Sequence, residues 1–136
     1  MPSGQPTVPE SVPPPPALHE LEAEVMEQLW TAGEASVRTV MDALNGRAAR
    51  PRAYTTYMTV MARLRTKGLL LRRREGKTDY YAPVHGREEY LALRARSEVE
   101  GLVAQYGDLA LSEFAAHVSG LDPARRRALQ RLARGG

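Results

Sequence analysis

The chain has 136 residues, of which 43% are hydrophobic and none is cysteine, and its formal net charge is +3 at pH 7. This size suits one small domain with an appendage, and the missing thiols exclude disulfides, thiolate metal sites and cysteine nucleophiles. No apolar run reaches the roughly 18 residues of a membrane span and the N-terminus lacks a secretory pattern, so we expect a cytoplasmic protein without membrane insertion.

Positive charge is concentrated in the middle of the chain. Residues 10–42 hold seven acidic residues against one arginine, whereas residues 47–77 hold ten basic residues against one glutamate. Residues 79–136 hold eight of each sign. A basic block of this kind favours a polyanionic partner, and nucleic acid is the first candidate. A solvated surface is the alternative, although such surfaces usually mix both signs.

The first segment, residues 1–17, contains seven of the ten prolines. Proline removes a backbone donor, and the segment has little apolar surface to bury, so we expect a disordered or polyproline-like tail. A tail of this composition could bind a proline-reading partner, but an inert tail is the simpler interpretation.

Two short helices are predicted next. Residues 18–33 repeat apolar side chains at helical spacing, and Gly33 ends the pattern. The apolar side of this helix is formed by Leu18, Leu21, Val25 and Leu29. The second helix covers residues 37–45, with Ser36 as its N-cap and Gly46 just beyond its end.

A third helix is predicted from about residue 55 to residue 67, and Gly68 ends it. Helical spacing separates two faces of this segment. The inward face consists of Tyr57, Val60, Met61 and Leu64, and the outward face of Thr55, Met58, Thr59 and Ala62. As an alternative to an outward role, Thr55 or Thr56 could cap the helix.

Residues 69–74 and 78–83 are strand-like and flank Glu75-Gly76-Lys77, which indicates a hairpin. Of the adjacent Tyr80 and Tyr81, one should be buried and the other exposed. Three helices followed by a hairpin predict a mostly α fold with a small β wing. We therefore assign residues 18–84 to a winged helix-turn-helix domain that binds DNA.

Residues 85–136 are predicted to form three helices, the last with Asp122 as N-cap and Pro123 at its first position. These helices have apolar faces, but a segment of about 50 residues is too small to bury those faces by itself. Either these helices pack on the first domain, or two copies pair across a two-fold axis. Pairing fits DNA binding better, because two linked half-sites bind more tightly than one, so we predict a dimerisation domain. The expected interface residues are Tyr90, Leu91, Val99, Leu102, Val103, Tyr106, Leu111, Phe114, Leu129 and Leu132.

The third predicted helix and the hairpin supply the candidate DNA contacts. The N-terminal end of a recognition helix meets base edges in the major groove. The predicted base-reading residues are Thr55, Thr56, Met58 and Thr59, a set suited to thymine methyl groups rather than to bidentate guanine reading. The predicted phosphate-binding residues are Arg52, Arg63, Arg65, Lys67, Arg72, Arg73, Arg74 and Lys77.

Catalytic and metal sites are not predicted. "GKT" at residues 76–78 resembles the end of a phosphate-binding loop, but that motif requires glycine where this chain has Leu71. The three histidines lack metal-ligand spacing, and no serine has a histidine–acid arrangement beside it. We therefore expect no enzyme activity, no cofactor and no metal.

Three motifs in order resemble the BlaI/MecI penicillinase-repressor family over residues 18–134. They are "LHELEAEVMEQLW" at 18–30, "YTTYMTVMARLRTKGLL" at 54–70 and "YYAP" at 80–83, and "LALSEF" at 109–114 extends the similarity. The family's form in high-GC actinobacteria is the most similar. The resemblance implies a homodimeric winged-helix repressor, active in antibiotic resistance, that binds palindromic operators with TACA/TGTA-like half-sites in promoters.

The resemblance also implies how repression ends. Family members are released when a membrane sensor-protease of the BlaR/MecR type, activated by β-lactam, triggers cleavage in the second C-terminal helix. The matching pair here is Glu113-Phe114, in which glutamate replaces the family's asparagine. Related copper-responsive repressors use C-terminal cysteines, and this chain has none.

Two other functions remain open from the sequence. One is a winged-helix regulator that binds a small molecule, with Tyr90, Tyr106 and Phe114 lining its pocket. The other is a protein-interaction winged helix whose basic face binds an acidic partner. The second would show no preference among DNA sequences.

Overall fold

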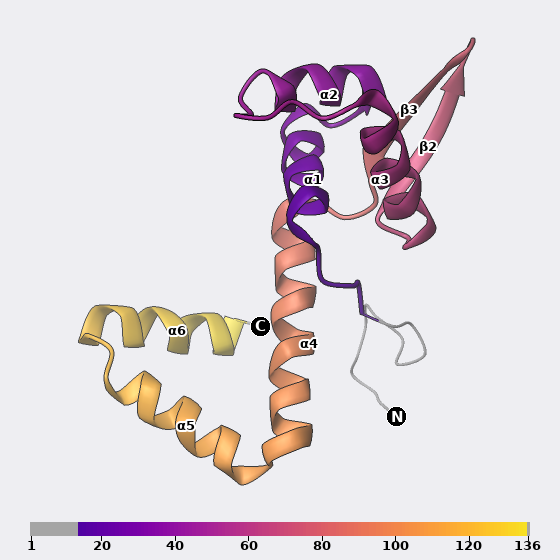
Figure 1. Ribbon diagram of the computed structural model, residues 1–136. Helices are drawn as coiled ribbons and strands as arrows, with labels where there is room; N and C mark the ends of the chain where they lie inside the picture. Colours follow the sequence, from indigo (N-terminus) through magenta and orange to yellow (C-terminus); the bar gives the residue numbers. More distant parts are fainter. Residues whose placement is uncertain (1–13, 136) are drawn as a thin grey trace. The chain divides into compact units, whose positions relative to one another are not determined.

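The computed structural model describes residues 14–135, and within that range the chain forms six helices and a three-stranded sheet (Figure 1). The helices are α1 (Glu20–Ala32), α2 (Val37–Asn45), α3 (Tyr54–Thr66), α4 (Arg87–Tyr106), α5 (Asp108–Ser119) and α6 (Pro123–Gly135). The strands are β1 (Ala35–Ser36), β2 (Leu70–Glu75) and β3 (Thr78–Pro83). Among the described residues, no helix is both long and apolar enough to cross a membrane.

The apolar stripes of α1, α2 and α3 meet in one core. Val25 and Leu29 of α1, Val40 of α2 and Met61 of α3 are each completely buried in it. All four residues predicted for the inward face of α3 are buried there, which confirms that helical spacing identified this face. Burial of side chains this large supplies most of the stabilisation of so small a domain.

β2 and β3 form a hairpin (Figure 1). β1 pairs with the other edge of β3, so the strand order is β1-β3-β2 and all pairs are antiparallel. Tyr81 is buried, as the alternation of strand side chains predicts, whereas Tyr80 is half-buried and not fully exposed, since the guanidinium of Arg73 lies over its ring. The two-residue strand β1 was not predicted, because it is too short to show any periodicity. It exists through its pairing with β3, where Ser36 lies opposite Tyr80.

Local signals fixed several helix ends as expected. Ser36 caps α2, since its Oγ accepts a hydrogen bond from the Thr39 amide at 3.2 Å. Asp122 caps α6 through the amide of Arg125 at 2.9 Å. Gly68, at φ +83°, ends α3 in a Schellman motif in which the Leu69 amide donates to the Leu64 carbonyl at 3.0 Å. The predicted winged helix-turn-helix order with three further helices is confirmed.

The start of α4 packs on α1. The indole Nε1 of Trp30 donates to the carbonyl of His85 at 2.8 Å, and the rings of Trp30 and Tyr90 lie 5.5 Å apart. The hydroxyl of Tyr90 donates to the carbonyl of Pro16 at 2.6 Å. Tyr90 is only 4% exposed. Tyr90 therefore belongs to the core that the first three helices form, which differs from the expectation that it lies in a dimer interface.

The proline-rich segment is described only in its last part. Residues 1–13, most of the predicted tail, lie outside the described residues. Pro15 and Pro16 are half-buried, and their carbonyl groups accept hydrogen bonds from Arg94 (2.9 Å) and Tyr90. These two prolines are therefore held against α4.

The chain divides into two compact units, with the boundary between Ala95 and Arg96. The sequence placed this boundary after residue 84; the first unit extends further because Tyr90 packs into its core. Within the second unit many large apolar side chains are exposed, by 38% to 72%. They are Val99, Leu102, Tyr106, Leu109, Leu111, Leu129 and Leu132.

Candidate nucleic-acid interface

The outer face of α3 is exposed in the part of the chain that the structure describes. Thr55, Thr56, Met58 and Thr59 are all exposed, Met58 by 44%, as the sequence predicted for base-reading residues. Four exposed positions at helical spacing, next to a buried stripe on the same helix, are the arrangement expected of a recognition helix.

The N-terminal end of α3 has no side-chain cap. Its N-cap is Ala53, in extended conformation, so neither Thr55 nor Thr56 caps the helix. Among the described residues, no hydrogen bond uses the hydroxyl of either threonine. Both hydroxyl groups are therefore available to a ligand, as donor or as acceptor.

A shallow hollow of about 310 Å³ lies against this face of α3. Its lining combines three hydroxyl groups and one guanidinium: it is formed by Thr55, Thr56, Thr59, Val60 and Arg63. This composition can accept both a base edge and a phosphate.

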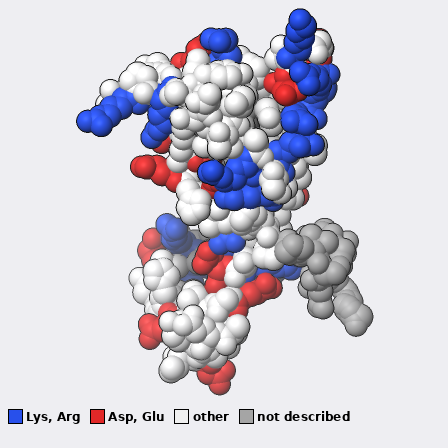
Figure 2. Space-filling view, turned by 45° about the vertical axis from the view of Figure 1, so that its right-hand side comes forward, with Lys and Arg blue, Asp and Glu red and all other residues white. Residues whose placement is uncertain are grey.

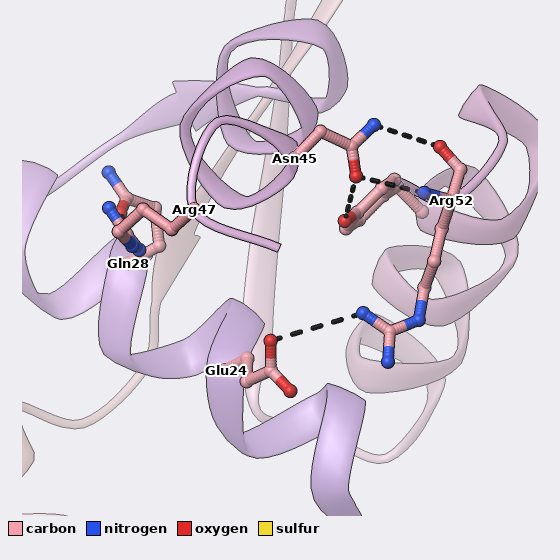
Figure 3. Close-up of polar contacts among 6 residues, drawn as sticks. Glu24, Gln28, Asn45, Arg47 and Arg52 are labelled. Atoms are coloured by element: carbon pink, nitrogen blue, oxygen red, sulfur yellow. Dashed lines mark hydrogen bonds and ion pairs between the residues drawn. The ribbon is translucent and has the colours of Figure 1, made fainter. Parts of the chain in front are cut away.

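Asn45, the last residue of α2, holds the loop that leads into α3 (Figure 3). Its Oδ1 accepts hydrogen bonds from the Arg52 amide at 3.0 Å and from the Tyr57 hydroxyl at 2.7 Å, and its Nδ2 donates to the Arg52 carbonyl at 2.9 Å. This role of Asn45 was not predicted from the sequence, because Asn45-Gly46 has the pattern of an ordinary helix end.

The C-terminal end of α3 is held by a buried carboxylate. Glu22 of α1 is only 2% exposed, and its Oε2 lies 2.7 Å from Nζ of Lys67. Its Oε1 accepts a hydrogen bond from the His19 amide at 3.0 Å. Burial raises the pKa of Glu22, but the hydrogen bonds from His19 and Lys67 and the charge of Lys67 outweigh burial and leave the pKa below its ordinary value. Lys67, predicted to bind phosphate, is thus engaged within the protein.

Arg73 on the wing is also engaged. Its guanidinium bonds to Glu34 at 2.9 Å and to Glu75, and it lies 4.9 Å from the centroid of the Tyr80 ring. The hydrogen bond from Arg73 lowers the pKa of Glu34. A DNA phosphate would compete with these two carboxylates for Arg73.

The other predicted phosphate-binding residues differ in how free they are. Arg63, Arg65, Arg72 and Lys77 are exposed, and no ion pair among the described residues involves them. Arg74 lies 3.7 Å from Asp79, and Arg52 lies 4.0 Å from Glu24. Figure 2 shows many basic side chains near one edge of the first of two compact units, which ends at Ala95.

Comparison with known proteins decides the family. The sequence model of the family described as "Penicillinase repressor" matches residues 18–134, nearly all of the part that the structure describes. The chain belongs to the penicillinase repressor family. This confirms the resemblance inferred from the three motifs.

Two curated relatives carry the description "Transcriptional regulator BlaI", from Mycobacterium tuberculosis strains CDC 1551 / Oshkosh and ATCC 25618 / H37Rv. Each is 49% identical to this member of the penicillinase repressor family over 76 residues, which make up 55% of this chain and 54% of the relative. The match thus spans about half the length of these relatives.

A solved structure described as "Solution structure of the DNA binding domain of the repressor BlaI" is also similar. Its sequence is 26% identical to that of this penicillinase repressor family member. The alignment covers 56% of this chain and 90% of that chain, with a TM-score of 0.49.

Two other kinds of site considered from the sequence can be compared with the described residues. Within residues 14–135, no group of three or more histidine, aspartate and glutamate side chains is arranged to hold a metal ion. Tyr90, a candidate for a small-molecule pocket, is packed against Trp30 and bonded to Pro16.

Proposed function

We propose that this chain is a homodimeric transcriptional repressor that binds a palindromic operator with TACA/TGTA-like half-sites, without enzyme activity or cofactor. The observation that carries the proposal is the free outer face of α3, whose hydroxyl groups no described contact uses, beside exposed arginines. Membership of the penicillinase repressor family makes promoters of β-lactam-response genes candidate targets.

The chemistry of the side chains indicates which residues would contact bases and which would contact phosphates. Thr55, Thr56 and Thr59 would hydrogen-bond to base edges or touch a thymine methyl group, and Met58 would add apolar contact. The exposed cations would bind phosphates, which gives affinity and salt dependence without choosing a sequence. These cations are Arg63, Arg65, Arg72 and Lys77, with Arg52 and Arg74 as weaker candidates because carboxylates lie near them.

Dimerisation is supported by the second unit. Its exposed apolar residues, among them Leu102, Tyr106 and Leu132, are more than a unit this small can bury by itself. A second copy offers the same surface by two-fold symmetry, and two linked half-sites bind far more tightly than one.

Release by proteolysis would occur in α5. Glu113 is exposed and Phe114 half-buried, and both lie inside this helix. Because proteases bind their substrates extended, cleavage of the Glu113-Phe114 bond by a sensor-protease of the BlaR/MecR type would require the helix to unwind locally.

Binding to selected DNA tests the proposal. The purified full chain is offered a pool of random duplexes, and bound duplexes are sequenced after several rounds. We expect enrichment of an inverted repeat, with half-sites about one or more helical turns apart. Binding of all duplexes without enrichment would instead support a module that binds an acidic partner, and would reject sequence-specific repression.

A further inference from the structure

The N-terminal end of α3 poses a structural problem. The first amides of a helix lack partners within it, and a side-chain cap normally binds one of them. The side chain of Ala53 has no acceptor that could cap the helix. Its backbone carbonyl accepts hydrogen bonds from the amides of Thr56 (3.0 Å) and Tyr57 (3.4 Å). Yet this turn carries the threonines that would read bases, and a frayed turn could not hold them in place.

Asn45 meets this need from outside the helix. Its amide bonds to both the N–H and the C=O of Arg52, the residue just before the N-cap, and to the hydroxyl of Tyr57 in the first turns of α3. The amide orientation is unambiguous, because a backbone N–H can only donate and a carbonyl can only accept. The side chain of Asn45 thus binds both Arg52, in the loop before the N-cap, and the helix α3 that follows.

We propose that Asn45 is a positioning residue that sets the DNA-reading end of α3. The proposal rests on the proposed DNA-binding function and adds the residue that holds its reading surface. Tyr57 is completely buried, so its hydroxyl is a fixed point of the core. Asn45 therefore ties the loop to the core and not merely to the adjacent loop residues.

Asparagine is the side chain that this position requires. Aspartate would keep both acceptor bonds, but it would place an oxygen against the Arg52 carbonyl, where Nδ2 now donates at 2.9 Å. Alanine would remove all three hydrogen bonds. The neighbouring contact of the same loop, from Arg47 to Gln28 at 3.2 Å, is separate (Figure 3).

The test compares three variants of the full chain. Asn45→Asp removes the donor, Tyr57→Phe removes one hydroxyl and leaves the ring in the core, and Gln28→Ala is the control that releases only Arg47. Each is measured with the best selected duplex and with a random duplex, at a temperature where thermal melting shows the variant to be folded. Amide hydrogen exchange is followed at Thr56 and Tyr57 without DNA.

We expect Asn45→Asp to lower the ratio of selected to random affinity by about tenfold, the effect of one lost base contact. Tyr57→Phe should lower it less, and Gln28→Ala should leave it unchanged. Affinity for the random duplex and its salt dependence should not change in Tyr57→Phe, which keeps every charge. Asn45→Asp adds one negative charge beside Arg52 and should weaken binding of both duplexes alike, an effect that the ratio cancels. A positioning role also predicts faster exchange at Thr56 and Tyr57 in Asn45→Asp than in the control.

An unchanged ratio in both Asn45→Asp and Tyr57→Phe, or unchanged exchange at the first turn of α3, would overturn the proposal. If Asn45→Asp does not fold, Tyr57→Phe decides. If the unmodified chain prefers no duplex, the DNA-binding function is wrong, and the exchange measurement still decides whether Asn45 positions α3.

Discussion

Glu22 and Lys67 form an unequal ion pair: the two side chains are 3% and 26% exposed, although their charged atoms lie only 2.7 Å apart. Lys67→Met would leave a buried carboxylate without its counter-charge, which should lower the free energy of unfolding by about 3 kcal/mol. Glu22→Gln keeps an acceptor for the His19 amide and leaves a lysine that reaches water, so its cost should be about 1 kcal/mol.

Urea unfolding followed by the fluorescence of Trp30, the single tryptophan, measures both changes. Glu24→Gln is the control, because the pair of Glu24 and Arg52 is exposed and 4.0 Å long and should contribute less than about 0.5 kcal/mol. Equal costs for Lys67→Met and Glu22→Gln would contradict the view that burial makes this pair unequal.

The same pair predicts how stability depends on pH. The pKa of Glu22 is lower in the folded chain than its ordinary value of 4.5, so the folded state favours the charged form. The stabilisation is complete above the ordinary value and is lost as the pH falls through the lowered pKa. We expect unfolding curves of the unmodified chain and of Glu22→Gln to differ at pH 7 and to converge below pH 4.5. A constant difference down to pH 3 would show that the pKa of Glu22 is not lowered.

Replacement of the basic residues of the wing should change DNA affinity to different extents. Arg72→Ala and Lys77→Ala each remove an exposed cation, and each should reduce the slope of log affinity against log salt by about one unit. Arg73→Ala should change the slope less, because a phosphate must first displace Glu34 and Glu75 from its guanidinium. Glu34→Gln should accordingly raise affinity for random duplexes. Equal slopes for Arg72→Ala and Arg73→Ala would mean that DNA displaces the carboxylates at no cost.

Base reading should depend on the exposed hydroxyl groups of α3. Thr56→Ala should reduce discrimination between the preferred half-site and a changed one by about 1–3 kcal/mol, if its hydroxyl makes a full base contact. Thr66→Ala is a matched control, since Thr66 is an exposed threonine at the opposite end of the same helix. Competition binding with single-base variants measures both. Equal losses of discrimination in the two variants would show that Thr56 does not contact a base.

The second unit should control the oligomeric state. Leu102→Glu places a charge on the exposed apolar surface, and sedimentation should then show a monomer at concentrations where the unmodified chain is a dimer. Leu71→Glu is the control, because Leu71 is a 62% exposed leucine of the wing. If both variants sediment like the unmodified chain, Leu102 is not in the interface; a monomeric unmodified chain would reject dimerisation itself.

Most of the fold could be predicted from the periodic spacing of apolar residues. The buried and exposed faces of α3 and the alternation of Tyr80 and Tyr81 could be predicted because each repeats at the period of its element. β1 could not, because two residues have no period and the strand depends on a partner far along the chain.

The polar contacts of the site were less predictable. Glu22, Glu34 and Asn45 each act through residues 7 to 45 positions away, and such pairs leave no local pattern in a single sequence. Lys67 and Arg73 were therefore assigned to phosphate although both hold carboxylates of the chain. Tyr90 was assigned to the dimer interface for the same reason, since its contact with Trp30 is not visible in the spacing.

The separation of buried and exposed positions along α3 has an evolutionary consequence. Because Ala53 supplies no side-chain cap and, among the described residues, no hydrogen bond uses the hydroxyl of Thr55 or Thr56, substitution of these two exposed threonines opens no cavity and breaks no hydrogen bond. If this surface reads the operator, as we propose, new operator preferences can arise by mutation of it while the scaffold beneath stays intact, which would let one ancestral repressor diversify into many regulons.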